Sequence, residues 1–370
     1  MKLEKRIQPS NQLSEKEYRA LKGRISSSDI RIFIKSRKSF YNQCVLGYKD
    51  ENNVETASTI LGNIADCILT CGQEEVDKRF VIASAGVPGG QLGELCEVLY
   101  KRAMKGMRME EDGSYTQTES FEVLFNDAVE TVRRKDKFKG KEMDKILELF
   151  IKPDKDGIIS EHYYREKLNH IGKTVVDVDM LASGEKIAND LRTSPYTMDV
   201  INMENTEDIQ VFKQMIVLFT YRGIELRGML DQVEVNHLKK YIQPYDIKTT
   251  YDNEGFDRSY LKGLYIQAAT YDKGLHKWAI EHGLDDYEIL PMKYPVADTC
   301  NENIPLMYNL TEEDLRRAYK GFYTKGSSKW YPGLDETLDA IKWHVDTGIW
   351  NVSKYAYDKQ GKLELEIEYK

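Results

Sequence analysis

The stretch Gly228-Met-Leu-Asp231 and, after a short spacer, Asp246-Ile-Lys248-Thr-Thr250 decide the fold that we expect for this chain. Both lie in segments rich in Leu, Met, Val, Ile and Tyr, at 223–236 and 241–250. Such runs, bounded by Gly, Asn and other polar residues, predict two neighbouring strands. A similar run at 211–221 predicts a third strand before them.

Three ionisable residues are placed together by the alternation of side chains along these strands. Side chains two residues apart share one face of a strand. Asp231 therefore interrupts an apolar row, where a charge is unfavourable unless it is paired or bound to a metal. Asp246 and Lys248 point to the same side of the next strand. We expect two carboxylates and one lysine to reach a common centre.

This combination suits the hydrolysis of a phosphodiester. The attacking water must become nucleophilic near neutral pH and the charge growing on the phosphate must be neutralised, and hard divalent ions with oxygen ligands do both. Asp231, Asp246 and the main-chain carbonyl of Ile247 are the expected ligands of Mg²⁺ or Mn²⁺. Lys248 would orient the water and offset charge in the transition state. A plainer interpretation stays open, in which Asp246 and Lys248 form an ion pair on a solvated edge strand.

A helix with an amide in its apolar stripe is expected next along the chain. The run from Phe256 to about Ile280 has helical periodicity and places Gln267 and Tyr271 one turn apart on one face. An unsatisfied amide is unfavourable there, so we expect Gln267 to contact substrate phosphate or the lysine. Tyr271, taken alone, fits core packing better than a role in a site.

The order of these motifs resembles that of the PD-(D/E)XK nucleases, and within them the RecB- and RecE-like recombination exonucleases that many phages encode. The resemblance implies an α/β fold with a restriction-endonuclease-like αβββαβ core, a central mixed sheet flanked by helices, and large helical N-terminal and C-terminal additions. It also implies catalytic roles for Asp231, Asp246, Lys248, Gln267 and Tyr271.

Weaker matches to the same family lie upstream. Residues 25–30 look like its N-terminal opening, and residues 60–69 look like its first site helix. In the Gly-x-x-x-His pattern of that helix, the position of the metal-binding histidine holds Asp66. Aspartate is also a good ligand for hard ions, so Asp66 is a further candidate metal ligand, and a solvated helix residue is an equally good interpretation.

Composition and cysteine spacing restrict the class of protein. With 370 residues, 41% hydrophobic and 31% charged, the chain can bury a large core. It has no long apolar run and no signal-peptide pattern, so we expect a cytoplasmic protein, in the host cytoplasm if a phage encodes it, and no membrane partner. Only Cys300 follows the lysine, whereas iron–sulfur relatives carry three closely spaced cysteines there. We expect reduced, mostly buried cysteines and no iron–sulfur cluster.

The net charge of −8 argues against DNA binding through overall basicity. Basic residues interleaved with aromatic residues still suit single strands and frayed ends. The candidate DNA-binding residues are Arg316, Arg317, Lys320, Lys325 and Lys329, near Tyr319, Phe322, Tyr323, Trp330 and Tyr331. The basic segment 133–141 is a second candidate, and a solvated surface is the alternative for both.

The remaining pattern divides the chain into four regions within one integrated catalytic domain. These are an N-terminal extension at 1–24, a mainly helical region at 25–207 with the first site helix at about 58–72, a nuclease core at 208–310, and C-terminal helices with a hairpin at 311–370. Further expected elements are N-caps at 26–28 and at 58 or 59, a helix over 161–202, strands at 287–295 and 305–310, helices at 311–322 and 334–347, and the hairpin around 358–361.

From these patterns we favour a Mg²⁺-dependent deoxyribonuclease that resects linear double-stranded DNA as an exonuclease, in phage-type recombination or repair. The preference for an exonuclease follows from the resemblance alone. One alternative is an endonuclease or single-strand-specific nuclease of the same fold. Another is an inactive nuclease-fold module that binds DNA or a partner. A single-strand annealing protein and further copies of the chain are candidate partners.

Overall fold

The computed structural model describes residues 13–48, 56–84, 86–110, 115–300, 302–325 and 327–363. The chain forms two compact units. The first, which we call the sheet unit, comprises residues 1–49, 191–298 and 303–370; the second, the helical unit, comprises residues 50–190 and 299–302. These limits differ from the boundaries expected at 24, 207 and 310, and the integration of the chain into one catalytic domain stays a prediction.

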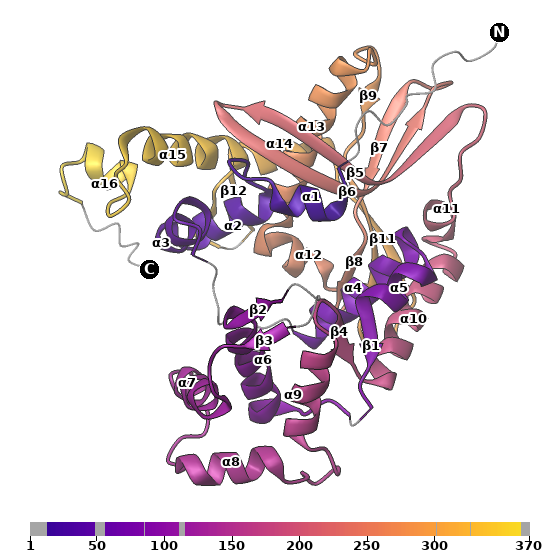
Figure 1. The fold of residues 1–370 in the computed structure, drawn as a ribbon. Helices are drawn as coiled ribbons and strands as arrows, with labels where there is room; N and C mark the ends of the chain where they lie inside the picture. The colour runs from indigo at the N-terminus through magenta and orange to yellow at the C-terminus, as the bar shows by residue number, and fades with distance from the viewer. Residues whose placement is uncertain are drawn as a thin grey trace. The chain divides into compact units, whose positions relative to one another are not determined.

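A seven-stranded mixed sheet forms the centre of the sheet unit (Figure 1). Strands β5, β6 and β7 are antiparallel, β10 runs parallel to β7 and β8, and β11 is antiparallel to β10. The bounds are β5 Ile209–Tyr221, β6 Ile224–Asn236, β7 Tyr241–Tyr245, β8 Lys248–Thr250, β9 Glu288–Ile289, β10 Lys293–Asp298 and β11 Leu306–Asn309. All the predicted strands of this region are present, but the strand predicted at 241–250 is interrupted at residues 246 and 247, and the strand predicted at 287–295 is divided into β9 and β10.

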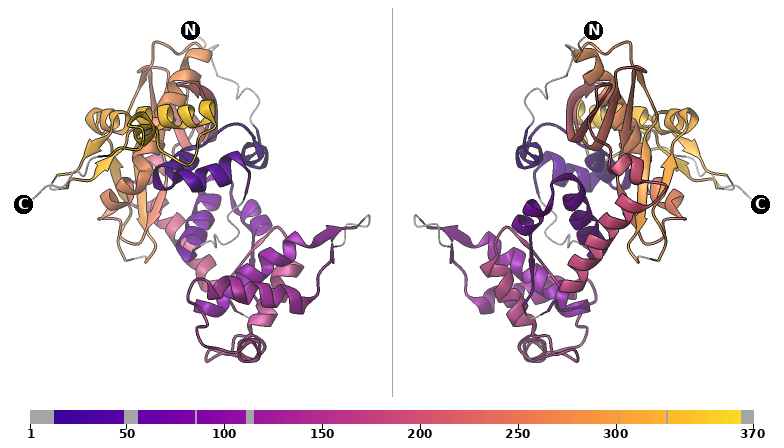
Figure 2. Two further views of the ribbon diagram at one scale, coloured as in Figure 1. Left: turned by 90° about the vertical axis from the view of Figure 1, so that its left-hand side faces the viewer. Right: turned by 90° about the vertical axis from the view of Figure 1, so that its right-hand side faces the viewer.

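Helices flank this sheet and bury its apolar residues. The long helix α13 packs against β5 and β6, and α2, α14 and α15 pack against α13 (Figures 1 and 2). The interior contains Leu226, Leu230 and Val233 from β6 together with Ile266 and Leu275 from α13. The helices are α1 Glu15–Ala20, α2 Ser27–Lys35, α3 Arg37–Phe40, α11 Met198–Ile201, α12 Phe256–Ser259, α13 Tyr265–Glu281, α14 Glu312–Lys320, α15 Leu334–Thr347 and α16 Lys354–Asp358.

The helical unit has a separate core made mainly by α6, α7, α8 and α9. Its elements are α4 Ala57–Thr70, α5 Gln73–Arg79, β1 Phe80–Ile82, α6 Gly90–Lys105, β2 Met107–Met109, β3 Tyr115–Gln117, α7 Phe121–Arg133, α8 Met143–Ile151, α9 Ser160–Asn169, β4 Thr174–Val176 and α10 Val178–Thr193. Strand β1 pairs in parallel with β4, and β2 pairs with β3 as a hairpin. None of the described helices combines the length and apolar character needed to cross a membrane.

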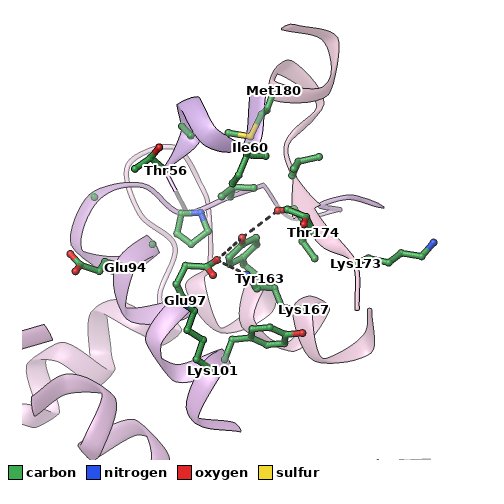
Figure 3. Close-up of a pocket in the computed structure, with 18 residues that line it drawn as sticks. Thr56, Ile60, Glu94, Glu97, Lys101, Tyr163, Lys167, Lys173, Thr174 and Met180 are labelled. Atoms are coloured by element: carbon green, nitrogen blue, oxygen red, sulfur yellow. Dashed lines mark hydrogen bonds and ion pairs between the residues drawn. The ribbon is translucent and has the colours of Figure 1, made fainter. Parts of the chain in front are cut away.

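A cavity of about 600 Å³ lies within the helical unit (Figure 3). Its apolar lining includes Ile60 and Met180, and an ion pair between Glu97 and Lys167 forms part of its wall. Tyr163 donates a hydrogen bond to the same Glu97 oxygen, Oε1, at 3.2 Å. None of the residues proposed above for catalysis lines this cavity.

Several local predictions are wrong, each for a physical reason. Strand β4 interrupts the helix expected over 161–202, because the Val-rich segment pairs with β1 far away in the sequence. Helix α4 begins earlier than expected, since Thr56, and neither Ser58 nor Thr59, accepts the capping hydrogen bond from Thr59 N–H at 3.2 Å.

The expected C-terminal hairpin is replaced by a helix over its first half. Ser353 caps α16, which occupies Lys354–Asp358, and a turn follows it. The segment that would form a second strand continues beyond residue 363, outside the described residues. By contrast, the N-cap predicted at 26–28 is confirmed at Ser26, which forms a capping box with Asp29.

Candidate active site

Asp246 lies at the interruption between β7 and β8 and is 1% exposed. Its N–H donates to the carbonyl of Lys293 on β10 at 3.1 Å, which fixes the backbone at this point. Oδ1 accepts a hydrogen bond from Gln267 Nε2 at 3.1 Å, and Oδ2 pairs with the ammonium of Lys248. The ion pair predicted for Asp246 and Lys248 is therefore present, but it is not on a solvated edge, because the carboxylate is buried.

Asp231 on β6 holds the same turn from the other side. Its Oδ2 accepts a hydrogen bond from the N–H of Ile247 at 2.7 Å. The carbonyl of Ile247 accepts from Lys248 Nζ at 3.2 Å. The two carboxylates, the lysine and the Ile247 main chain thus converge as the alternation along the strands predicted.

Gln267 and Tyr271 connect α13 to this centre. Gln267 Nε2 also donates to Tyr271 Oη at 3.0 Å, and Tyr271 Oη donates to the carbonyl of Met229 at 2.8 Å. Gln267 therefore contacts Asp246 rather than Lys248, and its expected contact with a substrate phosphate stays a prediction. The result is a hydrogen-bonded chain from β6 through Tyr271 and Gln267 to Asp246.

Gly228 allows α13 to approach β6 this closely. A Cβ atom at this position would lie 3.0 Å from Cδ1 and Cε1 of Tyr271 and 3.1 Å from Cγ2 of Val217. These separations are tighter than ordinary van der Waals contact, so the Tyr271 ring would have to move. The glycine of the Gly228–Asp231 motif thus has a packing role.

Burial dominates the electrostatics of this centre. It raises the pKa of Asp246 above its usual value, because the charged form loses solvation; the cations Lys248 and Arg31 act in the opposite direction. The pKa of Tyr271 is raised well above its usual value, first by burial and then by the charge of Asp246. Tyr271 is therefore a neutral hydrogen-bonding group.

The oxygen atoms of this centre fit a hard divalent cation. Asp246 Oδ2 is buried and contacts the ammonium of Lys248. Asp231, Asp246 and the Ile247 carbonyl offer only oxygen ligands, and Mg²⁺ takes one or two carboxylates while it keeps several waters. No group of three or more His, Cys, Asp or Glu side chains with metal-binding spacing occurs among the described residues. These residues are therefore suited to an ion that stays partly hydrated.

Arg31 is a cation near this centre that was not predicted from the sequence. It is an exposed residue of α2, and its charge acts on Asp246. Its aliphatic stem packs on Gly263, where an added Cβ would lie 2.8 Å from Arg31 Cγ and where φ is +117°. An arginine among the apolar residues of Ile30-Arg-Ile-Phe-Ile34 was the available signal.

Asp66 belongs to the other unit of the chain. It is a half-buried residue of α4 in the helical unit, whereas Asp231 and Asp246 lie in the sheet unit. Its role as a metal ligand stays a prediction.

Some of the predicted DNA-binding cations form ion pairs within the sheet unit, and others are exposed. Arg316 and Arg317 both pair with Glu313, and Lys320 pairs with Asp335. Lys325 and Lys329 are exposed. In the second basic segment, Lys135 and Lys137 both pair with Glu94.

The cysteines are free thiols. Cys67 and Cys96 are buried and Cys44 is partly buried, but Cys71 and Cys300 are exposed. The expectation of mostly buried cysteines therefore fails for the last two, which lie at a helix end and in a loop.

Comparisons with known proteins give little further information. No family model matches the chain, and no curated protein matches it. A solved structure from Eubacterium rectale, described as that of a "putative exonuclease", is similar with a TM-score of 0.46 and 11% sequence identity, over 97% of each chain. Similarity at this level assigns neither a fold family nor an activity to the chain.

Proposed function

We propose that this protein is a Mg²⁺- or Mn²⁺-dependent deoxyribonuclease of the PD-(D/E)XK type that hydrolyses phosphodiester bonds. The observation that carries the proposal is the buried Asp246 carboxylate, shared between Lys248 and Gln267 beside the Asp231–Ile247 contact. Isolated buried charges are unfavourable, and Asp246 has one hydrogen bond and one ion pair for its several lone pairs. A bound cation would add a further favourable interaction.

Each residue has a defined task in this proposal. Asp231, Asp246 and the Ile247 carbonyl would hold the ion, which would supply polarisation of the phosphate and activation of the attacking water. Lys248 positions the water and offsets charge on the phosphate. Gln267 orients Asp246, Tyr271 orients Gln267, and Arg31 adds positive charge where a DNA phosphate approaches.

The preferred substrate in this proposal is the end of linear duplex DNA. The preference comes from the resemblance of the motif order to recombination exonucleases, as do the roles in recombination and repair and the candidate annealing partner. An endonuclease with the same residues would differ in cutting closed circles.

The test compares linear and covalently closed circular duplex DNA, each with Mg²⁺ and with EDTA. Loss of linear DNA alone, abolished by EDTA and by Asp246→Asn, supports the exonuclease. The matched control is Asp286→Asn, which removes an exposed carboxylate paired with Lys240 in the same unit and is expected to leave cleavage unchanged. Cutting of circles would replace the exonuclease by an endonuclease, and no metal-dependent cleavage of either DNA would refute the nuclease.

A further inference from the structure

A short hairpin of aromatic residues was not expected from the sequence. Strand β12, Phe322–Tyr323, pairs antiparallel with β13, Trp330–Tyr331, and the register sets Phe322 opposite Tyr331 and Tyr323 opposite Trp330. Neighbouring residues of a strand point to opposite faces. The hairpin therefore has one aromatic pair on each face.

The inner pair attaches the hairpin to the helix that carries Gln267. Phe322 and Tyr331 are stacked, with centroids 5.2 Å apart and an interplanar angle of 7°. Both rings meet the edge of Tyr265, at 5.3 and 6.3 Å. Tyr265 is the first residue of α13, and Gln267 follows two residues later. The hairpin is therefore fixed to the first turn of the helix that reaches Asp246.

The outer pair is exposed, and the ring of Trp330 is held in place. Tyr323 is 62% exposed and Trp330 is 39% exposed, and their ring centroids are 4.9 Å apart. Trp330 Nε1 donates to Glu336 at 2.7 Å, and the indole lies so close to Gly321 that an added Cβ there would be 2.2 Å from Cζ2. An exposed ring with a fixed orientation, such as that of Trp330, loses little conformational freedom on binding a ligand.

Two lysines lie in the connection between these strands. Lys325 and Lys329 are exposed, and Lys329 Nζ lies 4.8 Å over the ring of Tyr331. The neighbouring Arg316, Arg317 and Lys320 are engaged by carboxylates of the same unit. Exposed aromatic faces next to cations are the combination that binds the bases and phosphates of single-stranded nucleic acid.

We propose that Tyr323 and Trp330 form a stacking platform for unpaired bases of a DNA strand, with the exposed Lys325 neutralising a phosphate. The platform deepens the proposed nuclease function, on which the choice of DNA as the ligand rests. It gives the protein higher affinity for DNA with a single-stranded end than for blunt duplex. Stacking on one aromatic side chain is worth about 1–3 kcal/mol per base, which corresponds to about a 5- to 150-fold change in affinity.

The experiment measures DNA binding in EDTA, where no metal-dependent cleavage takes place. The probes are a labelled blunt duplex, the same duplex with an oligothymidylate overhang, and the free oligothymidylate. Tyr323→Ala is expected to weaken binding of the overhang and the single strand by about 5-fold or more, with little effect on the blunt duplex. Tyr323→Trp is expected to restore binding, because it restores a stacking surface. The matched control is Tyr355→Ala, which removes another exposed tyrosine, 59% exposed, from α16.

Equal binding of the overhang by wild type and Tyr323→Ala would overturn the platform. An equal loss of affinity for the blunt duplex in Tyr323→Ala would also overturn the platform, because it would show a general effect on DNA binding. A change of oligomeric state in Tyr323→Ala would overturn it as well, because the aromatic pair would then be a contact between copies of the chain. The two proposals can fail separately. If Tyr323→Ala loses binding of the overhang but the wild-type protein cleaves no DNA, only the nuclease proposal is refuted.

Discussion

Tyr271→Phe is the substitution that tests the hydrogen-bonded chain behind the site most directly. It removes only the hydroxyl, so the ring still fills the space beside Gly228 and no cavity forms. The hydroxyl donates to the Met229 carbonyl at 2.8 Å and accepts from Gln267 Nε2 at 3.0 Å. The carbonyl of Met229 loses a donor, while Gln267 keeps its bond to Asp246. Loss of these buried bonds is expected to reduce the free energy of unfolding by about 1–3 kcal/mol.

Catalysis is expected to fall as well, through the orientation of Asp246. Without the hydroxyl, Gln267 is held only by the carboxylate that it is meant to orient. Loss of an outer hydrogen-bond partner of a metal ligand typically reduces metal affinity or activity by about 10- to 100-fold. The matched control is Tyr294→Phe, because Tyr294 is also fully buried in this unit but its hydroxyl makes only a long contact of 3.5 Å with Leu264 O. We expect Tyr294→Phe to reduce the free energy of unfolding by less than about 1 kcal/mol and to leave the rate of DNA cleavage unchanged.

The assay combines urea unfolding with the rate of DNA cleavage. All four tryptophans lie in the sheet unit, so tryptophan fluorescence reports on the unit that contains the site. A Tyr271→Phe protein with the stability and cleavage rate of wild type would refute the orienting chain. Equal losses in Tyr271→Phe and Tyr294→Phe would show that the effect comes from removing any buried hydroxyl.

Two further substitutions test the charge of Arg31 beside the candidate site and the ion pair of Glu97 with Lys167 in the helical unit. Arg31→Ala removes a cation that lowers the pKa of Asp246, so the pKa of Asp246 should rise and protons should compete with Mg²⁺ up to higher pH. The Mg²⁺ affinity measured by calorimetry should therefore be weaker than that of wild type at acidic pH and equal to it at higher pH. Identical pH profiles of Mg²⁺ affinity for the variant and wild type would contradict this. Glu97→Gln leaves the buried Lys167 without its counter-charge and should destabilise the protein by about 3 kcal/mol, the low end of the range since Glu97 is 23% exposed. Most of that loss should be recovered in Glu97→Leu with Lys167→Met, as followed by circular dichroism in urea, and a double variant no more stable than the single one would be evidence against the charge explanation.

The alternation of side chains predicted the proximity of Asp231, Asp246 and Lys248. The structure pairs Asp246 with Lys248 and bonds Asp231 to the N–H of Ile247, although residues 246 and 247 lie between β7 and β8 and not within one strand. The spacing of Gln267 and Tyr271 is a consequence of helical periodicity, and they are bonded to one another. Spacing determines which residues share a face, but not what lies opposite that face, which is why the contact of Gln267 with Asp246 was not predicted.

Pairings between distant or very short segments could not be predicted in the same way. Strand β4 pairs with β1, although helices α6 to α9 separate the two strands in the sequence. Strands β12 and β13 have two residues each, which is too few to show an alternation. Other signals were present in the sequence and were not used. Glu313 precedes Arg316 and Arg317 by three and four residues on one helix, a spacing that favours the observed ion pairs over contacts with DNA.

The exposure of Asp246 bears on whether the site is functional or a relic. On a solvated strand, an Asp–Lys pair contributes little to stability. At 1% exposure the carboxylate loses its solvation, and an apolar residue of similar volume would often serve the fold as well or better. An inactive binding module would have no need of this carboxylate, whereas a metal site requires it. Calorimetry separates the two, since a nuclease should bind Mg²⁺ or Mn²⁺ and lose that binding when Asp231 and Asp246 are both replaced by Ala, while a relic should bind neither ion even as wild type.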